Sequence, residues 1–237
     1  MIISIIHPSR GRPERSIQSI RNWVANAGVD VQVIVSVDQS DPKLPLYEEI
    51  YQEYMAFRSL DKFIIGEGNS AVDATNLGAK AADGDILMYV SEDLECFENW
   101  GGCLLEVVDG KEDWILKTQD GTQLWIITLP IMDRKYYNRF GYFYHPGYLH
   151  NFCDTEMTAV ADMLQRKLTC DLLFYHKHYT VAKTHKDEVS IKADASWDQG
   201  QKLFLERYQK DFDLVNPPAK VEARHIGWIK RFGVAIK

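Results

Sequence analysis

The chain has few of the features that mark secreted, membrane or zinc-stabilised proteins. It contains four cysteines in 237 residues, and no two of them form a Cys-x-x-Cys pair: Cys96, Cys103, Cys153 and Cys170. We therefore expect no disulfide framework or zinc site, and reduced thiols in a cytoplasm are the simplest interpretation. The first thirteen residues have no basic segment before their short apolar run, so they do not resemble a signal peptide. No apolar stretch has the length needed to span a bilayer.

Positive charge is also scarce. The 27 lysines and arginines are outnumbered by 34 aspartates and glutamates, which gives a net charge of −7. A general nucleic-acid-binding protein normally presents a basic face, so this charge argues against that class, although a local basic patch is still compatible with it. The exception is the segment 220–237, with five basic residues and one acidic residue. This segment could touch a membrane surface or an anionic acceptor, or simply pack on the domain.

Apolar runs alternate with helix-like segments through the first part of the chain. Because 46% of the residues are hydrophobic, a sizeable core can form. The alternation predicts an α/β fold with a mostly parallel central sheet and helices on both faces. The predicted strands are Ile2–Ile6, Val31–Val37, Lys62–Ile65 and Ile86–Val90, and the predicted helices are Pro13–Asn26, Leu46–Phe57 and Ser70–Ala82.

The second part of the chain has a less regular pattern. Trp114–Lys117 and Gln123–Leu129 are strand-like, and Gln119-Asp-Gly121 between them predicts a hairpin turn. Further along, the pattern predicts helices over 130–140, 154–167 and 196–209 and a short strand over 171–175. An aromatic loop over 142–148 separates the first two of these helices.

Polar or conformationally special residues follow each predicted strand of the first part: Pro8, Asp38, Gly66 and Asp93. Parallel sheets bind ligands at the carboxyl ends of their strands, so these residues should converge on one rim. Asp38 could accept hydrogen bonds from a base or ribose, or form an Asx-type turn. Glu92 and Asp93 could hold a divalent cation beside phosphates, or form a solvated turn that caps the next helix. The spacing alone favours the turn.

Two further groups could take part in chemistry. Asp154 and Glu156 begin a predicted helix, where a carboxylate is commonly a cap but could also be a general base. His176, His178 and His185 follow the last predicted strand, and imidazole suits Mn²⁺ and other transition ions. Surface histidines in a basic loop are the simpler interpretation of this group.

Gly66-Glu-Gly-Asn-Ser-Ala71 matches the dinucleotide-binding fingerprint between a strand and a helix. It supports an alternative function, an NAD(P)-dependent oxidoreductase. The fingerprint normally opens the first strand–helix unit, however, whereas two such units precede it here. A turn followed by a helix capped by Asn69 or Ser70 explains the same residues.

The order of these features resembles that of GT-A-fold glycosyltransferases, especially the family 2-like group. Three segments carry the resemblance: ISIIHPSRGRP at the start, VSVDQSD at the second strand end, and the stretch from Asn69 to Gly84, which leads into ILMYVSED. The resemblance covers residues 2–100 well and Phe152–His178 more loosely. It implies a single GT-A domain with a nucleotide-sugar-binding half, 1–110, and an acceptor-binding and C-terminal half, 111–237.

The resemblance assigns roles to individual residues. Asp38 resembles the family's nucleotide-base contact, and Ser91-Glu92-Asp93 stands in place of its Asp-x-Asp metal motif, with Ser91 as the departure. It implies that Asp93 and a histidine of the pair His176 and His178 hold Mn²⁺ or Mg²⁺. Asp154 then corresponds to the catalytic base, with Glu156 as a supporting acid. Further donor-binding residues are expected at Pro8, Arg10, Arg12, Asn69, Asn76 and Glu92.

The implied reaction is inverting transfer of a sugar from a nucleotide-diphosphate sugar, with UDP expected as the nucleotide, to an acceptor hydroxyl. The acceptor could belong to a glycan, a lipid-linked sugar or, although the net charge does not indicate it, a nucleic acid. A protein that keeps the fold and binds the sugar nucleotide without turnover is a third hypothesis, which the serine at position 91 permits.

Overall fold

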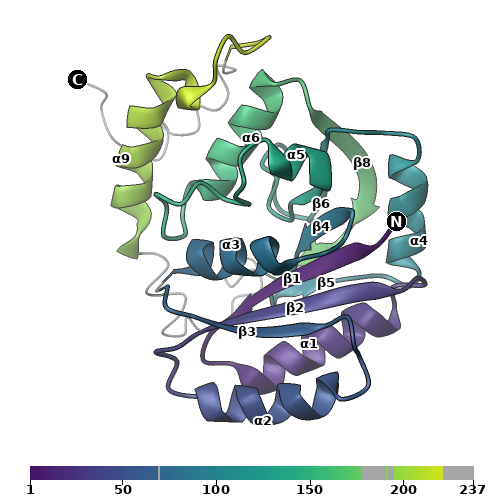
Figure 1. Cartoon of the computed structure of the whole chain (residues 1–237). Coiled ribbons are helices and arrows are strands. Elements are labelled where there is room, and N and C mark those ends of the chain that lie inside the picture. The colour runs from purple at the N-terminus through teal and green to yellow at the C-terminus, as the bar shows by residue number, and fades with distance from the viewer. Residues whose placement is uncertain (69, 178–190, 192–194, 221–237) are drawn as a thin grey trace.

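The computed structural model describes residues 1–68, 70–177, 191 and 195–220 (Figure 1). A seven-stranded sheet with the order β3-β2-β1-β4-β7-β6-β8 lies at its centre. Its strands are β1 (Ile3–Ser9), β2 (Val31–Asp38), β3 (Lys62–Gly66), β4 (Ile86–Tyr89), β6 (Ile115–Gln119), β7 (Ile131–Asp133) and β8 (Lys167–Leu173). Only β7 runs antiparallel to its two neighbours. The predicted α/β class with a mostly parallel sheet is therefore confirmed.

Helices cover both faces of the sheet (Figure 1). The helices are α1 (Pro13–Ala25), α2 (Leu44–Met55), α3 (Ala71–Ala81), α4 (Trp100–Val108), α5 (Arg134–Asn138), α6 (Cys153–Met163) and α9 (Trp197–Tyr208). Side chains of α1, α2 and α4 belong to one buried cluster, and those of α3, α5, α6 and α9 to another. Ile5 and Ile6 fall in different clusters, because successive side chains of a strand point to opposite faces. Both faces of β1 are thus buried, which explains its unbroken apolar run.

A short second sheet joins two distant segments. β5 (Leu94–Glu95) pairs antiparallel with β9 (Tyr175–His176), so that Leu94 lies opposite His176. This pairing brings the segment after β4 next to the end of β8. Among the described helices, none combines the length and apolar character needed to cross a membrane.

The hairpin predicted around Gln119-Asp-Gly121 is wrong. Residues 120–130 form a loop, and the antiparallel neighbour of β6 is β7, which begins after these eleven residues. The buried Asp120 carboxylate explains the loop, because it accepts the backbone N–H groups of Thr122 and Gln123, both at 2.6 Å, and the Thr128 hydroxyl. These bonds satisfy the backbone without a strand ladder.

Two predicted helices are shorter than expected. The helix predicted over 130–140 is limited to α5, because Ile131–Asp133 pairs with the sheet and the Asp133 side chain caps the helix at Tyr136 N. The helix predicted over 154–167 ends at Met163, and Lys167 already begins β8.

Candidate active site

The loops after β1 and β2 are joined by polar side chains at the carboxyl ends of these strands. Arg10 lies 2.9 Å from the Asp38 carboxylate, which also accepts the Ser40 backbone N–H at 2.6 Å. Burial disfavours the charged carboxylate, but the hydrogen bonds from Ser40 and the charge of Arg10 outweigh it and lower the pKa of Asp38. Asp41 accepts the Gly11 N–H at 2.6 Å and is also buried. This part of the rim is therefore held in one arrangement, with Asp38 ionised.

A cavity of about 220 Å³ opens beside Asp38. It lies between the ends of β2 and β3 and the first turns of α3, and its lining consists of Val37, Asp38, Gly66, Glu67, Gly68, Asp73, Ala74 and Leu77. The cavity is large enough for a planar ring system and presents carboxylate oxygens, which accept hydrogen bonds from N–H donors. Pro8, on the neighbouring strand, lies in register with Ser36 of β2.

The glycines of the dinucleotide-like motif serve the packing of α3. A Cβ atom at Gly66 would lie 2.6 Å from Leu77, and one at Gly68 would lie 2.4 Å from Asp73. Ser70 caps α3 by accepting the Asp73 N–H at 3.0 Å and donates its hydroxyl to the Asp73 carboxylate. A carboxylate thus occupies the helix terminus where the dinucleotide motif would bind a pyrophosphate, which disfavours that alternative. Asn69, the other expected cap and a predicted donor contact, lies outside the described residues.

Asp93 and His176, which are 83 residues apart, meet at the carboxyl end of β4. The pairing of β5 with β9 places His176 Nε2 3.1 Å from Asp93 Oδ2, and Ser91 donates its hydroxyl to Asp93 Oδ1. Burial opposes the charge on Asp93, but the bond to His176, its charge and the Ser91 hydroxyl lower the pKa of Asp93 well below its usual value. Burial opposes the charge on His176 as well, but Asp93 raises the pKa of His176 overall. The two side chains therefore form an ion pair.

This pair has the donor chemistry of a divalent cation site. A carboxylate oxygen and an imidazole nitrogen are ligands that Mn²⁺ accepts, and phosphate oxygens can supply the others. No cluster of three or more His, Cys, Asp or Glu side chains suited to a metal occurs in the described part of the chain. A cation would therefore need ligands from a bound diphosphate as well. His178, the other predicted ligand, falls outside the described residues.

Glu92 points away from Asp93 toward β1. Its carboxylate accepts the Ser9 hydroxyl, lies 4.0 Å from His7 Nε2, and lies 3.7 Å from the Arg12 guanidinium. Burial lowers the pKa of His7, and its Nδ1 donates to the Val90 carbonyl at 2.8 Å. Glu92 and Arg12, both predicted to bind the donor, thus lie together beneath the loop after β1.

Asp154 lies in the first turn of α6. The cap position is occupied by Phe152, which has a φ of 71° and makes no side-chain cap bond, whereas Asp154 accepts the Thr155 N–H at 2.7 Å. Burial raises the pKa of Asp154, and the charge of Asp154 contributes to the raised pKa of His176. Asp154 therefore lies close enough to His176 for its charge to add, after those of Asp93 and Asp120, to the raised pKa of that histidine.

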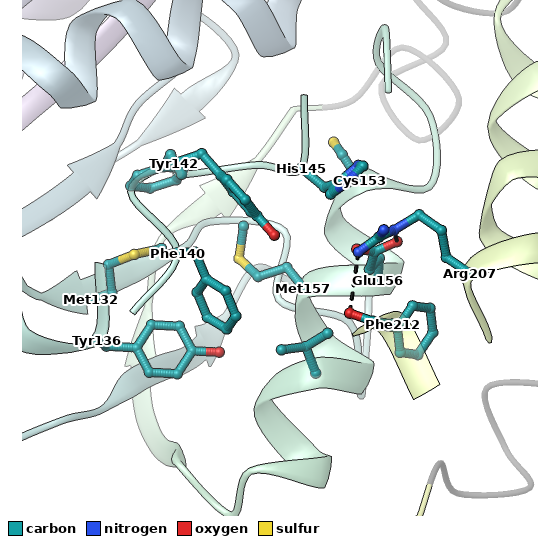
Figure 2. A pocket seen from close by; sticks show the side chains of 12 residues that line it. Met132, Tyr136, Phe140, Tyr142, His145, Cys153, Glu156, Met157, Arg207 and Phe212 are labelled. Atoms are coloured by element: carbon teal, nitrogen blue, oxygen red, sulfur yellow. Dashed lines mark hydrogen bonds and ion pairs between the residues drawn. The ribbon is translucent and has the colours of Figure 1, made fainter. Parts of the chain in front are cut away.

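Glu156, the predicted supporting acid, lies in a different environment. It is 3% exposed and accepts the Tyr148 hydroxyl at 2.6 Å and the Arg207 Nε at 2.8 Å. Figure 2 shows its carboxylate against the Arg207 guanidinium, at the edge of a mostly aromatic pocket of about 30 Å³, roughly the space of a single water molecule. In this arrangement Glu156 joins α6 to α9.

Asn76, predicted to contact the donor, is bonded to the aromatic loop. Its side-chain oxygen accepts the N–H groups of Phe143 and Tyr144 at 2.8 and 2.9 Å, and its Nδ2 donates to the Tyr144 carbonyl at 2.8 Å. These three bonds fix the position of Tyr144, whose ring packs edge-to-face on Tyr89 with centroids 6.1 Å apart.

The sequence interpretation missed several residues that shape the rim. Ser9 and Tyr47 share a hydrogen bond of 2.6 Å, and the Tyr47 hydroxyl also accepts the Arg12 N–H. Asp120 fixes the loop after β6, and its own carbonyl accepts the His176 N–H at 2.9 Å. Asp41 and Asp120 carried a usable signal, since each lies in a turn-like segment.

Comparison with known proteins gives matches in structure alone. No family model and no curated protein sequence matches the chain. Residues 1–349 of S. aureus TarS in complex with UDP-GlcNAc superpose with a TM-score of 0.70 and 15% identity, over 98% of this chain and 71% of that one. The same protein in complex with UDP gives a TM-score of 0.60 and 16% identity, over 88% and 72%.

A second solved structure has the same architecture. The mannosyltransferase PcManGT from Pyrobaculum calidifontis, in complex with GDP-Man and Mn²⁺, gives a TM-score of 0.62 and 12% identity. The match covers 91% of this chain and 65% of the mannosyltransferase, so this chain spans just under two-thirds of that protein. Together with the sheet order, these similarities show that the chain has a GT-A-type fold.

Proposed function

We propose that this protein is a glycosyltransferase that moves a sugar from a nucleotide-diphosphate sugar to an acceptor hydroxyl. The observation that carries the proposal is the Asp93–His176 pair at the carboxyl end of β4, within a GT-A-type fold. TarS, with UDP-GlcNAc, and PcManGT, with GDP-Man and Mn²⁺, support a donor of this class.

The donor would lie across the strand ends. Its base would occupy the cavity beside Asp38, whose ionised carboxylate can accept an N–H of the base. We take UDP as the expected nucleotide, as the family resemblance implies and as TarS with UDP-GlcNAc supports; guanine presents N–H groups too, so GDP-mannose belongs in the same test. Arg10 and Arg12, on the loop after β1, would face the diphosphate, since guanidinium groups pair well with phosphate oxygens.

Asp93 and His176 would hold a Mn²⁺ or Mg²⁺ ion together with the diphosphate. When bound, such an ion supplies Lewis-acid stabilisation of the negative charge on the leaving diphosphate. The ion pair that the two residues already form keeps Asp93 ionised, as a cation ligand must be, and His176 would release its Nε2 proton to solvent when that nitrogen binds the ion.

Asp154 would act as the general base. It would accept the proton of the acceptor hydroxyl as the oxygen attacks the anomeric carbon opposite the diphosphate, which inverts that centre. Glu156, bonded to Arg207 and Tyr148, would position α6 and take no proton.

Turnover of a donor panel tests the proposal. UDP-GlcNAc, UDP-glucose and GDP-mannose are incubated with the protein and Mn²⁺, and release of the nucleoside diphosphate is followed with and without EDTA. We expect slow hydrolysis of at least one donor that EDTA abolishes and that Asp93→Asn strongly reduces. A thermal shift with NAD(P) but with none of the three donors would support the oxidoreductase instead. Metal-dependent binding without any turnover would support a catalytically silent binding protein.

A further inference from the structure

Ser91 stands where the family pattern has the first acidic residue of the metal motif, and its hydroxyl has a defined partner. It donates a hydrogen bond to Asp93 Oδ1, two residues on. An ionised carboxylate can only accept hydrogen bonds, so the direction of this bond is fixed. The departure from the family pattern therefore replaces a second negative charge with a donor to the remaining one.

The two oxygens of Asp93 consequently face different partners. Ser91 binds Oδ1, while Oδ2 faces His176 Nε2 at 3.1 Å. The backbone at Asp93 is fixed as well, because its carbonyl accepts the Lys177 N–H at 2.8 Å. With the backbone and one oxygen held, the carboxylate cannot rotate freely, and Oδ2 stays directed toward the histidine.

Ser91 lies two residues after Tyr89, the last residue of β4. The ring of Tyr89 packs on Tyr144 at a centroid distance of 6.1 Å and an interplanar angle of 74°. Tyr144 is in turn held by Asn76. These contacts fix the end of β4 against the aromatic loop and α3, directly before the turn that carries Ser91 and Asp93.

We propose that Ser91 is a positioning residue for the divalent cation: it holds Asp93 so that Oδ2 and His176 Nε2 face the ion together, and it is not itself a ligand. The inference rests on the cation site of the proposed function. Hydrogen-bond partners of metal-binding carboxylates commonly change metal affinity by about 10-fold or more when removed.

Mn²⁺ binding to the full chain with bound UDP measures this role without any sugar transfer. Mn²⁺ is titrated into metal-free protein saturated with UDP, and the free-ion signal in electron paramagnetic resonance gives the affinity after a protein-free titration has corrected for Mn²⁺ held by free UDP. We expect Ser91→Ala to weaken Mn²⁺ binding by roughly 10-fold and Ser91→Thr, which keeps the hydroxyl, to stay within about 2-fold of the original protein. Tyr89→Phe, which removes the neighbouring hydroxyl, should give a smaller loss than Ser91→Ala.

Ser36→Ala is the matched control. Ser36 lies on β2, which β1 separates from β4, and donates its hydroxyl to the Ala74 carbonyl of α3 at 2.7 Å, so its loss should leave Mn²⁺ affinity unchanged. Circular dichroism and the melting temperature of each variant show whether it is folded. If Ser91→Ala alone does not fold, the Mn²⁺ affinities of Ser91→Asp and Tyr89→Phe still decide whether Ser91 positions Asp93.

Ser91→Asp separates the positioning role from a ligand role. A carboxylate at this position cannot donate to Asp93 and would repel it, so we expect weaker Mn²⁺ binding than in the original protein. Tighter binding in Ser91→Asp, or unchanged binding in both Ser91→Ala and Tyr89→Phe, would overturn the inference, as would a protein that binds no Mn²⁺. Normal Mn²⁺ binding without turnover of any donor would contradict the proposed function and leave the role of Ser91 intact.

Discussion

The two halves of the sheet position their functional residues by different means. In residues 1–110, parallel strands with buried faces carry Asp38 and Asp93 at their ends, and helices pack along their length. In residues 111–220, β7 is short and the pairing of β6 with β8 is irregular, and single polar side chains hold the loops: Asp120, Asp133 and Glu156 from this part, and Asn76 from α3. Donor binding would therefore depend on the sheet, whereas the acceptor side would depend on a few hydrogen bonds.

This difference suggests how the two sides would respond to substitution. Many backbone hydrogen bonds hold the end of a strand in place. Altering one side chain there should therefore remove one contact with a ligand and leave the backbone where it is. A loop fixed by one buried carboxylate or amide moves when that group is removed. Substitutions at strand ends and at the residues that hold loops should therefore differ in their effects on catalysis, ligand binding and stability.

Asp154→Asn should have the largest effect on catalysis. The amide cannot accept the acceptor proton, so we expect transfer to fall by about 10²–10⁴-fold, with nucleoside-diphosphate affinity unchanged. The pKa of Asp154 is raised by burial, and the base is lost as pH falls through that pKa. The acid limb of the rate profile should therefore lie at a higher pH than an ordinary aspartate would give. Unaltered turnover in Asp154→Asn would remove this residue from the mechanism.

Arg207→Ala should have the largest effect on stability. It leaves the buried Glu156 carboxylate without its cation, which typically costs about 3–5 kcal/mol. Urea denaturation measures this, with Lys202→Ala as the control: Lys202 is an exposed partner of Glu206 at 3.9 Å, and its loss should cost less than about 0.5 kcal/mol. Equal losses in the two variants would show that the Glu156–Arg207 pair does not hold α6 and α9 together.

Asn76→Ala should loosen the aromatic loop. It removes three hydrogen bonds to Phe143 and Tyr144, and we expect a loss of about 2 kcal/mol in the free energy of unfolding. Asn76→Asp keeps the acceptor oxygen for the two N–H groups but loses the donor to the Tyr144 carbonyl, so its effect should differ from that of alanine. A changed sugar-nucleotide affinity with unchanged stability would instead favour the direct donor contact predicted from the sequence.

Much of the first half could be predicted from the sequence, because strands buried on both faces give continuous apolar runs. The predicted strand Val31–Val37 differs from β2 by one residue, and Ser70 was among the expected caps of α3. The second half was harder to predict, because its loops depend on partners distant in sequence. Arg207 lies 51 residues from Glu156, and Asn76 lies 68 residues from Tyr144.

In the candidate site, too, some residues could be selected from the sequence, whereas contacts between distant segments could not. Asp38, Asp93 and Asp154 could be selected because each ends a strand or begins a helix, but the contacts of Glu92 with Ser9 and His7 depend on a parallel strand 83 residues away. No periodicity in the sequence contains that information. The dinucleotide-like motif likewise could be distinguished from a packing turn only once Asp73 was placed beside Gly68.

Ser70→Ala should have the smallest effect of the series. It removes the cap of α3, and we expect a loss of about 1 kcal/mol in the free energy of unfolding. Because the Asp38 end of the cavity is fixed by the sheet, the affinity for UDP should change little. A large drop in UDP affinity, measured by calorimetry, would mean that the start of α3 is part of the nucleotide site itself.

The central claim is that Asp93 holds a divalent cation beside the diphosphate of the donor. Calorimetric titration of UDP and GDP, with Mn²⁺ and with EDTA, tests this claim most directly when the original protein is compared with Asp93→Asn. The account predicts that one nucleotide binds at least about 10-fold more tightly with Mn²⁺, and that Asp93→Asn removes this difference without unfolding the protein. Equal affinity with Mn²⁺ and EDTA in the original protein, or the same Mn²⁺ enhancement in Asp93→Asn, would contradict it.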